Sequence, residues 1–267
     1  MNFTYFLKKI YEEQGIETIT KKVFCVKPII ELDKEEEKHL LEGDGQSNPY
    51  EYKQINSSTG LAVNYFKVLE SMGNIEELVF EDKVAIPLKG KGGRKANLDV
   101  SYKKDGKLFY VESKFLEPYY ANNEENKESY FKKENYPVPD NDKVAWYNLF
   151  VEAQSYEYYN FSQLCRHLLA IWRKHGHDSA PIVLQCITWL MPDTFIDRME
   201  SENDKKYFRN RREKYVEEAK KCNDCINSFL KTIRWKNMFF ESLYYNDIIA
   251  DISSSPKYIE FKKRYLL

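Results

Sequence analysis

Residues 97–115, NLDVSYKKDGKLFYVESKF, carry the clearest structural signal in this chain of 267 residues. Two strand-like runs, Leu98–Tyr102 and Leu108–Phe115, flank the dipeptide Asp105-Gly106. An Asp-Gly pair between two such runs is typical of a tight β-hairpin turn. The sequence therefore predicts a hairpin whose second strand, LFYVESKF, is apolar enough to be central in a sheet.

Charged side chains interrupt this hairpin at its open end. Because successive side chains of a strand point to opposite faces, Glu112 and Lys114 share one face of the second strand, and Asp99 lies on the first strand. Charged groups in a central strand are costly unless they are paired or bind a metal. We therefore expect a carboxylate pair and a lysine to form a site there.

This residue set suits phosphate chemistry. Two carboxylates offer the oxygen ligands that Mg²⁺ prefers, and a bound Mg²⁺ can lower the pKa of a water and neutralise charge on a phosphate. Lys114 would position that water or stabilise the developing negative charge. An exposed hairpin with a cross-strand ion pair would give the same local pattern, since 31% of the residues are charged.

The flanking sequence places the hairpin in an α/β arrangement. Apolar residues at helical spacing predict a helix over 56–72, and the remaining segments follow in order. We expect strands over 78–88, 98–102 and 108–115, a loop over 117–142, a helix over 146–174, a strand over 182–190, and a mostly helical segment over 197–235.

The pattern of Asp99, a hairpin and then Glu112-Ser113-Lys114 resembles the PD-(D/E)XK nuclease superfamily, the restriction endonuclease-like proteins. The predicted order of helix, three-strand meander, helix and strand matches the core of that superfamily. The helix FSQLCRHLLAIW, residues 161–172, carries Gln163, and many restriction-like members have a Gln on this helix that reaches the active site. His167 stands where those members usually have Tyr.

Two further segments are similar to a poorly characterised restriction endonuclease-like group. These are the first helix, with Ser57-Ser58 and Asn64-Tyr65-Phe66, and the QLCRHLL segment. The resemblance covers residues 56–190. It implies an enzyme, a Mg²⁺-dependent endonuclease that hydrolyses phosphodiester bonds of DNA, with a restriction or other defence role.

The resemblance also implies residue roles. Asp99, Glu112 and the carbonyl of Ser113 would hold Mg²⁺, for which Mn²⁺ would substitute, and Lys114 would serve the attacking water. Gln163 would reach the active site. Family members often add an acidic residue from the first helix, and Glu70 is the local candidate.

The resemblance divides the chain into three parts. Residues 1–55 form an N-terminal extension, residues 56–195 the nuclease-like core, and residues 196–267 a helical C-terminal extension packed on that core. The fold class is therefore α/β, with a restriction endonuclease-like core and an added helical C-terminal region.

Charge is segregated along the chain although the net charge is −1. Residues 31–44 are acidic, whereas 83–95 hold five basic residues and no acid, and 205–214 hold six basic residues and one acid. The net charge near zero excludes general coating of DNA, and the two basic segments favour a focused DNA-binding groove. The acidic residues 31–44 should face away from that groove. Within 83–95, the glycine-rich turn supplies candidate phosphate contacts, namely Lys89, Lys91, Arg94 and Lys95.

Cutting two strands with one site per chain favours a homodimer.

We expect neither a signal peptide nor a transmembrane helix in this sequence. Its first residues interrupt apolar positions with charges, and its longest apolar run, 181–192, is too short to span a bilayer, so we expect a cytoplasmic protein. The odd number of cysteines suits reduced thiols. Cys222 and Cys225 have zinc-ligand spacing, but no second pair completes a set, so packing is the simpler interpretation.

Two other functions stay open on the sequence. The same fold could serve as a non-catalytic nucleic-acid-binding or protein-interaction module. Alternatively, the hairpin is structural and the basic segment 205–214 is the functional surface.

Overall fold

The computed structural model describes residues 3–20, 24–41, 51–85, 95–120 and 128–267. It is a mixed α/β structure, in agreement with the predicted class. The α-helices are α1 (Phe3–Glu13), α2 (Lys34–Leu41), α3 (Ser58–Ser71), α4 (Asp140–Glu152), α5 (Phe161–His175), α6 (Asp193–Ile196), α7 (Glu202–Thr232), α8 (Tyr245–Ile248) and α9 (Tyr258–Tyr265).

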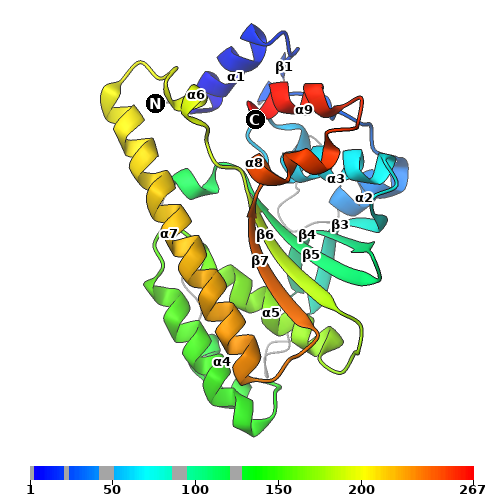
Figure 1. Cartoon of the computed structure of the whole chain (residues 1–267), viewed down its shortest axis with the longest axis vertical. Helices are drawn as coiled ribbons and strands as arrows, with labels where there is room; N and C mark the ends of the chain where they lie inside the picture. The colour runs from blue at the N-terminus through cyan, green and yellow to red at the C-terminus, as the bar shows by residue number, and fades with distance from the viewer. Residues whose placement is uncertain (1–2, 21–23, 42–50, 86–94, 121–127) are drawn as a thin grey trace.

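A five-stranded sheet forms the centre of the molecule (Figure 1). Its strands in spatial order are β3 (Glu76–Ala85), β4 (Lys95–Lys104), β5 (Lys107–Lys114), β6 (Ile182–Thr188) and β7 (Met238–Tyr244). The pairs β3–β4 and β4–β5 are antiparallel, whereas β5–β6 and β6–β7 are parallel. A separate two-stranded ribbon pairs β1 (Ile19–Thr20) with β2 (Phe24–Cys25).

The predicted hairpin is confirmed at its turn. Lys104 pairs with Lys107 across the turn residues Asp105 and Gly106, which both have positive φ, at 51° and 72°. Positive φ at both central residues is the requirement that makes Asp-Gly favourable in this turn. The turn fixes the register of β4 against β5, and with it the position of every side chain along the two strands.

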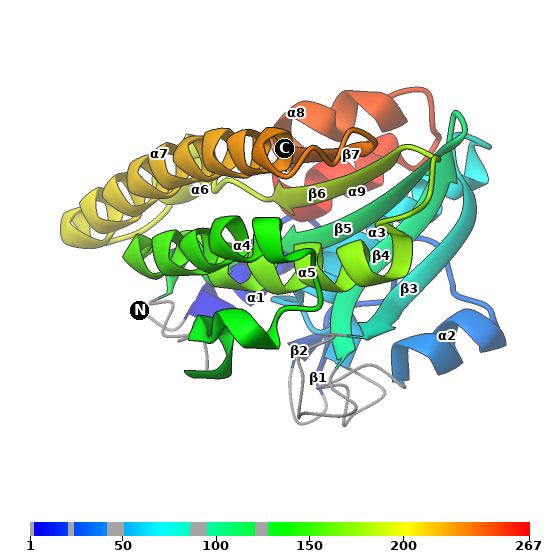
Figure 2. The ribbon, with the colours of Figure 1, turned by 90° about the horizontal axis from the view of Figure 1, so that it is seen from below.

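Helices cover both faces of the sheet (Figure 2). One hydrophobic cluster joins that sheet to α1, α3, α8 and α9, and a second joins it to α4, α5 and α7. Strand β6 is buried along its whole length because it lies between two strands and under helices on both faces. The sheet therefore has the two covered faces expected where parallel strands occur.

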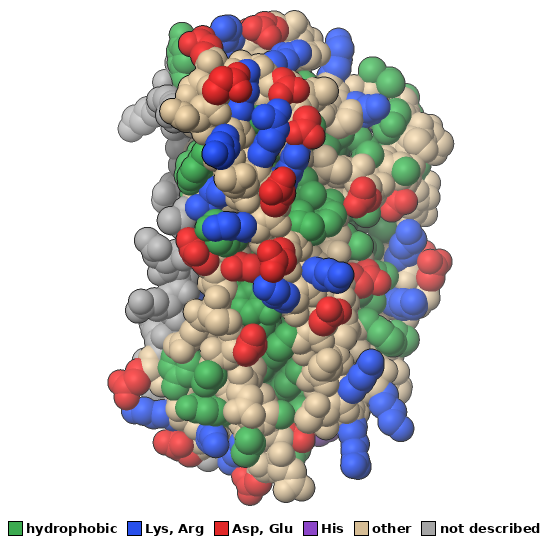
Figure 3. Space-filling model, turned by 60° about the vertical axis from the view of Figure 1, so that its left-hand side comes forward, with side chains coloured by type: hydrophobic (Ala, Val, Ile, Leu, Met, Phe, Trp, Pro, Cys, Tyr) green, Lys and Arg blue, Asp and Glu red, His purple; other side chains and the backbone are tan. Residues whose placement is uncertain are grey.

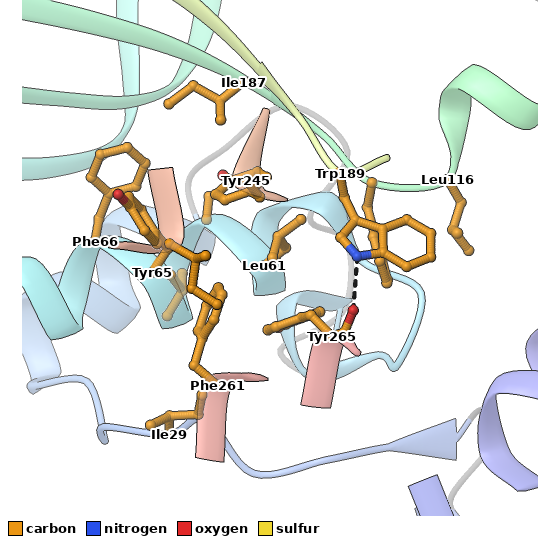
Figure 4. Packing of buried hydrophobic residues seen from close by; sticks show 14 of the residues in the cluster. Ile29, Leu61, Tyr65, Phe66, Leu116, Ile187, Trp189, Tyr245, Phe261 and Tyr265 are labelled. Carbon is orange, nitrogen blue, oxygen red and sulfur yellow. Dashed lines mark hydrogen bonds between the residues drawn. The ribbon is translucent and has the colours of Figure 1, made fainter. Parts of the chain in front are cut away.

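The first cluster packs residues from both ends of the chain against α3 (Figure 4). Tyr65 of α3 contacts the rings of Tyr245 and Phe261, with ring centres 5.3 and 5.8 Å apart. Trp189, just after β6, donates from Nε1 to the carbonyl oxygen of Tyr265 at 2.9 Å. The C-terminal helices thus share one core with the first helix of the predicted nuclease-like segment.

Most predicted elements are confirmed. The helix expected over 56–72 is α3, which Ser57 caps by accepting a hydrogen bond from the amide of Gly60. The strands expected over 98–102, 108–115 and 182–190 are β4, β5 and β6. The strand expected over 78–88 is β3 as far as residue 85, and its last residues lie outside the described residues.

Three expectations need correction. The single helix predicted over 146–174 is two helices, α4 and α5, because Asn160 caps a new helix by accepting a hydrogen bond from the amide of Gln163. The predicted loop over 117–142 contains short 3₁₀ helices at Glu117–Tyr119, Glu128–Phe131 and Lys133–Asn135 and the start of α4. The C-terminal region expected to be helical also supplies β7, whose pairing with β6 widens the sheet.

In the described part of the chain, no helix has the length and apolar character needed to cross a membrane.

Burial along β6 predicts a large effect of trimming a side chain there. Ile187 is 1% exposed in β6, whereas Ile259 in α9 is 63% exposed. Ile187→Ala should lower the free energy of unfolding by about 2–5 kcal/mol, since it leaves a cavity in a packed core. Ile259→Ala should change it by less than about 0.5 kcal/mol. Urea unfolding of both variants checks this, and equal shifts would contradict the described packing.

Candidate active site

The open end of the β4–β5 hairpin begins where the strand ladder stops. The last recorded pair is Val100 with Val111, and continuing that register sets Asp99 opposite Glu112. The carboxylate Oδ2 of Asp99 accepts a hydrogen bond from the backbone amide of Ser113 at 2.6 Å. Asp99 thus replaces a backbone acceptor at this point, and the two predicted carboxylates come together.

Glu112 is the centre of the site. Its side chain is 3% exposed, and each carboxylate oxygen has a partner. Lys114 Nζ lies 2.5 Å from Oε1, and His167 Nε2 of α5 lies 2.7 Å from Oε2. A buried carboxylate needs such partners because burial without them is strongly unfavourable.

Gln163 of α5 joins the same network. Lys114 Nζ donates to Gln163 Oε1 at 3.0 Å, and the side-chain amide of Asn160 donates to the same oxygen at 3.0 Å. The four predicted residues Asp99, Glu112, Lys114 and Gln163 therefore lie together, at the place where α5 packs over the end of β5.

Charge interactions set opposite protonation tendencies on the two acids. Burial would raise the pKa of Glu112, but Lys114 and His167 together lower that pKa to about 2. Burial raises the pKa of Asp99 well above its usual value, and repulsion from Glu112 and Glu81 raises that pKa further. Burial would lower the pKa of Lys114, but the neighbouring carboxylates of Glu112, Glu117 and Asp99 raise it. Glu112 and Lys114 thus form an ion pair beside a crowded second carboxyl group.

His167 is a site residue whose role the sequence left undefined. It is 3% exposed, and because an ionised carboxylate only accepts, the proton of a neutral imidazole lies on Nε2, toward Glu112. Its Nδ1 is buried and has no hydrogen-bond partner in the structure. The signal that could identify it is its spacing from Gln163, because residues four apart lie on the same helix face.

Glu81 of β3 is a second acid near Asp99, and sequence reasoning missed it. The register pairs Phe80 with Val100 and Asp82 with Leu98, which sets Glu81 opposite Asp99. Glu81 is 9% exposed and has a φ of 55°. Positive φ is uncommon for a residue other than glycine, and strand alternation alone gives no sign of such a local distortion.

The structure does not bring Glu70 into this group. Glu70 Oε2 accepts from Lys67 Nζ at 2.5 Å, and the same Nζ lies 2.6 Å from Glu36 of α2. Ser113 follows Glu112 directly, but its hydroxyl lies on the other side of the sheet, 2.9 Å from the hydroxyl of Tyr245. If Ser113 binds a metal ion, it would therefore do so through its backbone carbonyl oxygen and not through its hydroxyl.

A cavity of about 310 Å³ opens beside the network. Its lining includes Glu112, Lys114 and Gln163 and four tyrosines, namely Tyr120, Tyr158, Tyr159 and Tyr215. No described residue of the acidic segment 31–44 lines this cavity. The charged network is therefore reached from a cavity with aromatic walls.

The basic segment 205–214 lies on α7 and is engaged within the protein. Arg211 Nη2 donates to the carbonyl oxygen of Tyr120 at 2.5 Å, Arg212 binds Asp193 at 2.9 Å, and Arg209 binds Asp197 at 2.5 Å. On the face in Figure 3, basic and acidic side chains are interspersed. This segment therefore ties α7 to its neighbours.

Among the candidate phosphate contacts of the glycine-rich turn, Lys95 is exposed at the start of β4, whereas Lys89, Lys91 and Arg94 lie outside the described residues.

The two cysteines with zinc-ligand spacing belong to the packing of α7. Cys222 is fully buried and Cys225 half-buried, and both are free thiols. Burial raises the pKa of the Cys222 thiol well above its usual value. These environments suit packing residues better than thiolate ligands.

The donor set at the network suits a hard cation. In the described ranges, no group of three or more His, Cys, Asp or Glu side chains is placed to hold a metal ion. Mg²⁺, however, usually takes only one or two protein carboxylates and completes its shell with water and substrate phosphate. Asp99 and Glu112 are such a pair. Burial raises the pKa of Asp99 first, and repulsion from Glu112 and Glu81, which a cation would relieve, raises it further.

Comparison with known proteins identifies a family for this chain. No curated protein and no solved structure matches the chain. The model of one family, described as restriction endonuclease associating with ARP, matches residues 2–219. This segment contains Asp99, Glu112, Lys114 and Gln163. The chain therefore belongs to the family of restriction endonucleases associating with ARP.

Proposed function

We propose that this protein is a Mg²⁺-dependent endonuclease of the PD-(D/E)XK type that hydrolyses phosphodiester bonds of DNA in a restriction or other defence role. The observation that carries the proposal is the convergence of Asp99, Glu112, Lys114 and Gln163 at the end of one hairpin. The order of α3, β3, β4, β5, α5 and β6 also supports a core of this type. The family match supports a nuclease-like or defence role.

Each side chain has a separate part in this reaction. Asp99, Glu112 and the backbone carbonyl of Ser113 would hold Mg²⁺ or Mn²⁺, which would supply positive charge beside the scissile phosphate. Lys114 is held as an ammonium ion by its carboxylate neighbours, so it would stabilise negative charge that develops on the phosphate oxygens. Gln163 orients Lys114 by accepting one of its hydrogen bonds.

DNA is the proposed partner, and a second copy of the chain is proposed for cutting both strands. Each chain offers one such network in its described residues, and a two-fold dimer would present one network to each strand. The two carboxylates repel phosphate, so the proposed cation and Lys114 together must offset that repulsion.

A non-catalytic module on the same fold is the alternative. The observation in its favour is that Lys114 and His167 already engage both oxygens of Glu112. In that case the ion pair would be structural, and the protein would bind nucleic acid or another protein without a metal. Metal binding separates the two functions.

The first test is metal affinity measured by titration calorimetry. Titration of Mn²⁺ into the wild-type protein should give a measurable heat of binding. Glu112→Gln should lower the affinity for Mn²⁺ by tenfold or more, because loss of a group that only supports a metal ligand already lowers metal affinity by about 10- to 100-fold. Glu200→Gln changes an exposed residue of the same kind and should bind as the wild type does. Equal affinity of wild type and Glu112→Gln would favour the non-catalytic module.

The second test is cleavage by a lysine variant. Lys114→Ala should lower the rate of Mg²⁺-dependent DNA cleavage by about 100-fold or more, because removal of one donor to a developing oxyanion costs about that much. Lys236→Ala, at an exposed position, should cleave at the wild-type rate. A Lys114→Ala protein that is folded and fully active would rule out the assigned role.

The third test concerns the support of Glu112 by His167. His167→Ala leaves one oxygen of a buried carboxylate without its partner and should lower the free energy of unfolding by about 1–3 kcal/mol. His39→Ala at an exposed position should stay within about 0.5 kcal/mol of wild type. Urea unfolding at pH 7 gives both values. An unchanged midpoint for His167→Ala would mean that the Glu112 contact does not contribute.

A further inference from the structure

We propose that the cavity beside Glu112 and Lys114 binds a single unstacked nucleobase, so that the strand is held with one nucleotide out of its helical stack. This inference rests on the proposed nuclease function and deepens it. It names the substrate class as nucleic acid that is unpaired, or easily unpaired, at the site.

The cavity has the volume and the aromatic lining for a base. Its volume of about 310 Å³ lies at the small end of ligand pockets, which typically measure about 300–1,000 Å³. Tyr120, Tyr158, Tyr159 and Tyr215 line it, and Leu164 and Cys186 add apolar surface. Aromatic walls accept the flat face of any base, because every base has a π-face.

Cations hold one of these walls in place. The guanidinium of Arg211 lies 4.7 Å from the ring centre of Tyr158, and Lys214 Nζ lies 5.2 Å from the same centre. Lys214 also donates to the Tyr158 hydroxyl at 3.2 Å. Arg211 is in turn fixed by the carbonyl oxygens of Pro118 and Tyr120. Tyr158 is therefore a preset wall, which lowers the entropy lost when a ligand stacks on it.

Buried tyrosines support the deeper wall. The rings of Tyr159 and Tyr215 lie 5.1 Å apart, and their hydroxyls pair with Ser242 of β7 at 3.1 Å and with Thr188 of β6 at 2.7 Å. Both residues line the cavity, and their polar ends are satisfied elsewhere. The cavity is lined from β5, β6, α5 and α7 and from residues 117–120 and 158–160.

Polar groups lie where the sugar, phosphate and base edges would meet the wall. The polar lining includes the amides of Asn160 and Gln163, which carry both donors and acceptors, the ammonium of Lys114, and the carboxylates of Glu112 and Glu117. Lys214 is exposed beside Tyr158 and can contact a phosphate. A base in the cavity would place its own phosphate close to Glu112 and Lys114, which is the position that hydrolysis requires.

The energetic consequence is a preference for nucleic acid that is already unpaired. Extruding a base from a duplex costs a few kcal/mol, and this cost is least for a mismatched or single-stranded base. A pocket that takes one base should therefore bind a bulge or a single strand more tightly than a fully paired duplex. Stacking on one tyrosine should account for about a fivefold to hundredfold difference in affinity.

Fluorescence anisotropy with labelled DNA in EDTA tests the pocket without any cleavage. The probes are a paired 20-mer duplex, the same duplex with a one-nucleotide bulge, and its single strand. The wild type should bind the bulged duplex and the single strand at least about fivefold more tightly than the paired duplex. Tyr158→Ala should lose this preference, and Tyr158→Phe, which keeps the ring, should retain it.

Two further variants keep the test decisive. Tyr120→Ala removes an exposed part of the wall and should also weaken the preference, which covers the case in which Tyr158→Ala fails to fold. Tyr5→Ala changes a tyrosine that is 62% exposed and does not line the cavity, and it should bind as the wild type does. Equal binding of paired and unpaired DNA by the wild type would contradict the proposal that the cavity binds an unstacked base. So would an unchanged preference for unpaired DNA in both Tyr158→Ala and Tyr120→Ala.

The outcomes separate this proposal from the nuclease. If the protein prefers unpaired DNA through Tyr158 but does not cleave DNA with Mg²⁺, the result supports the base pocket and contradicts the nuclease function. If it cleaves paired DNA with no preference for unpaired sites, the result supports the nuclease function and contradicts the base pocket.

Discussion

The buried carboxylate of Glu112 is the constraint around which this structure is arranged. An isolated carboxylate at such a position in a central strand would be strongly unfavourable, so both of its oxygens must be partnered. Lys114 comes from the same strand, but His167 comes from α5, so the charge can be buried only when α5 lies across the end of β5. The contact that satisfies the charge also brings Gln163 and the cavity to the same place.

Local signals made the hairpin and its charged end predictable. Asp105-Gly106 sets the turn, the turn sets the register, and the register together with strand alternation brings Asp99 and Glu112 to one place. The pairing of Glu112 with Lys114 follows from the same alternation. The network itself could therefore be anticipated from residues 97–115, and the position of Gln163 from the resemblance on the following helix.

The rest depends on long-range packing that leaves no local trace. Glu81 lies opposite Asp99 and itself has a positive φ within β3, a local distortion that no periodic pattern encodes. Strand β7 pairs in parallel with β6, and parallel pairs are joined by long connections without a turn motif. The expected role of Glu70 depended on where α3 ends relative to the sheet, and in the structure its carboxylate pairs with Lys67. The basic segment on α7 is committed largely to contacts within the protein, with Arg211 holding Tyr120 and Tyr158 at the cavity.

The proposed function requires that the network at Asp99 and Glu112 hydrolyses DNA with a metal ion. The most direct measurement is a time course of cleavage of plasmid and single-stranded DNA by the purified protein, with Mg²⁺, with Mn²⁺ and with EDTA, beside the variant Asp99→Asn. We expect cleavage by the wild type with either metal, and none with EDTA or by Asp99→Asn. Absence of cleavage under every metal condition, or equal rates for wild type and Asp99→Asn, would contradict the proposed function.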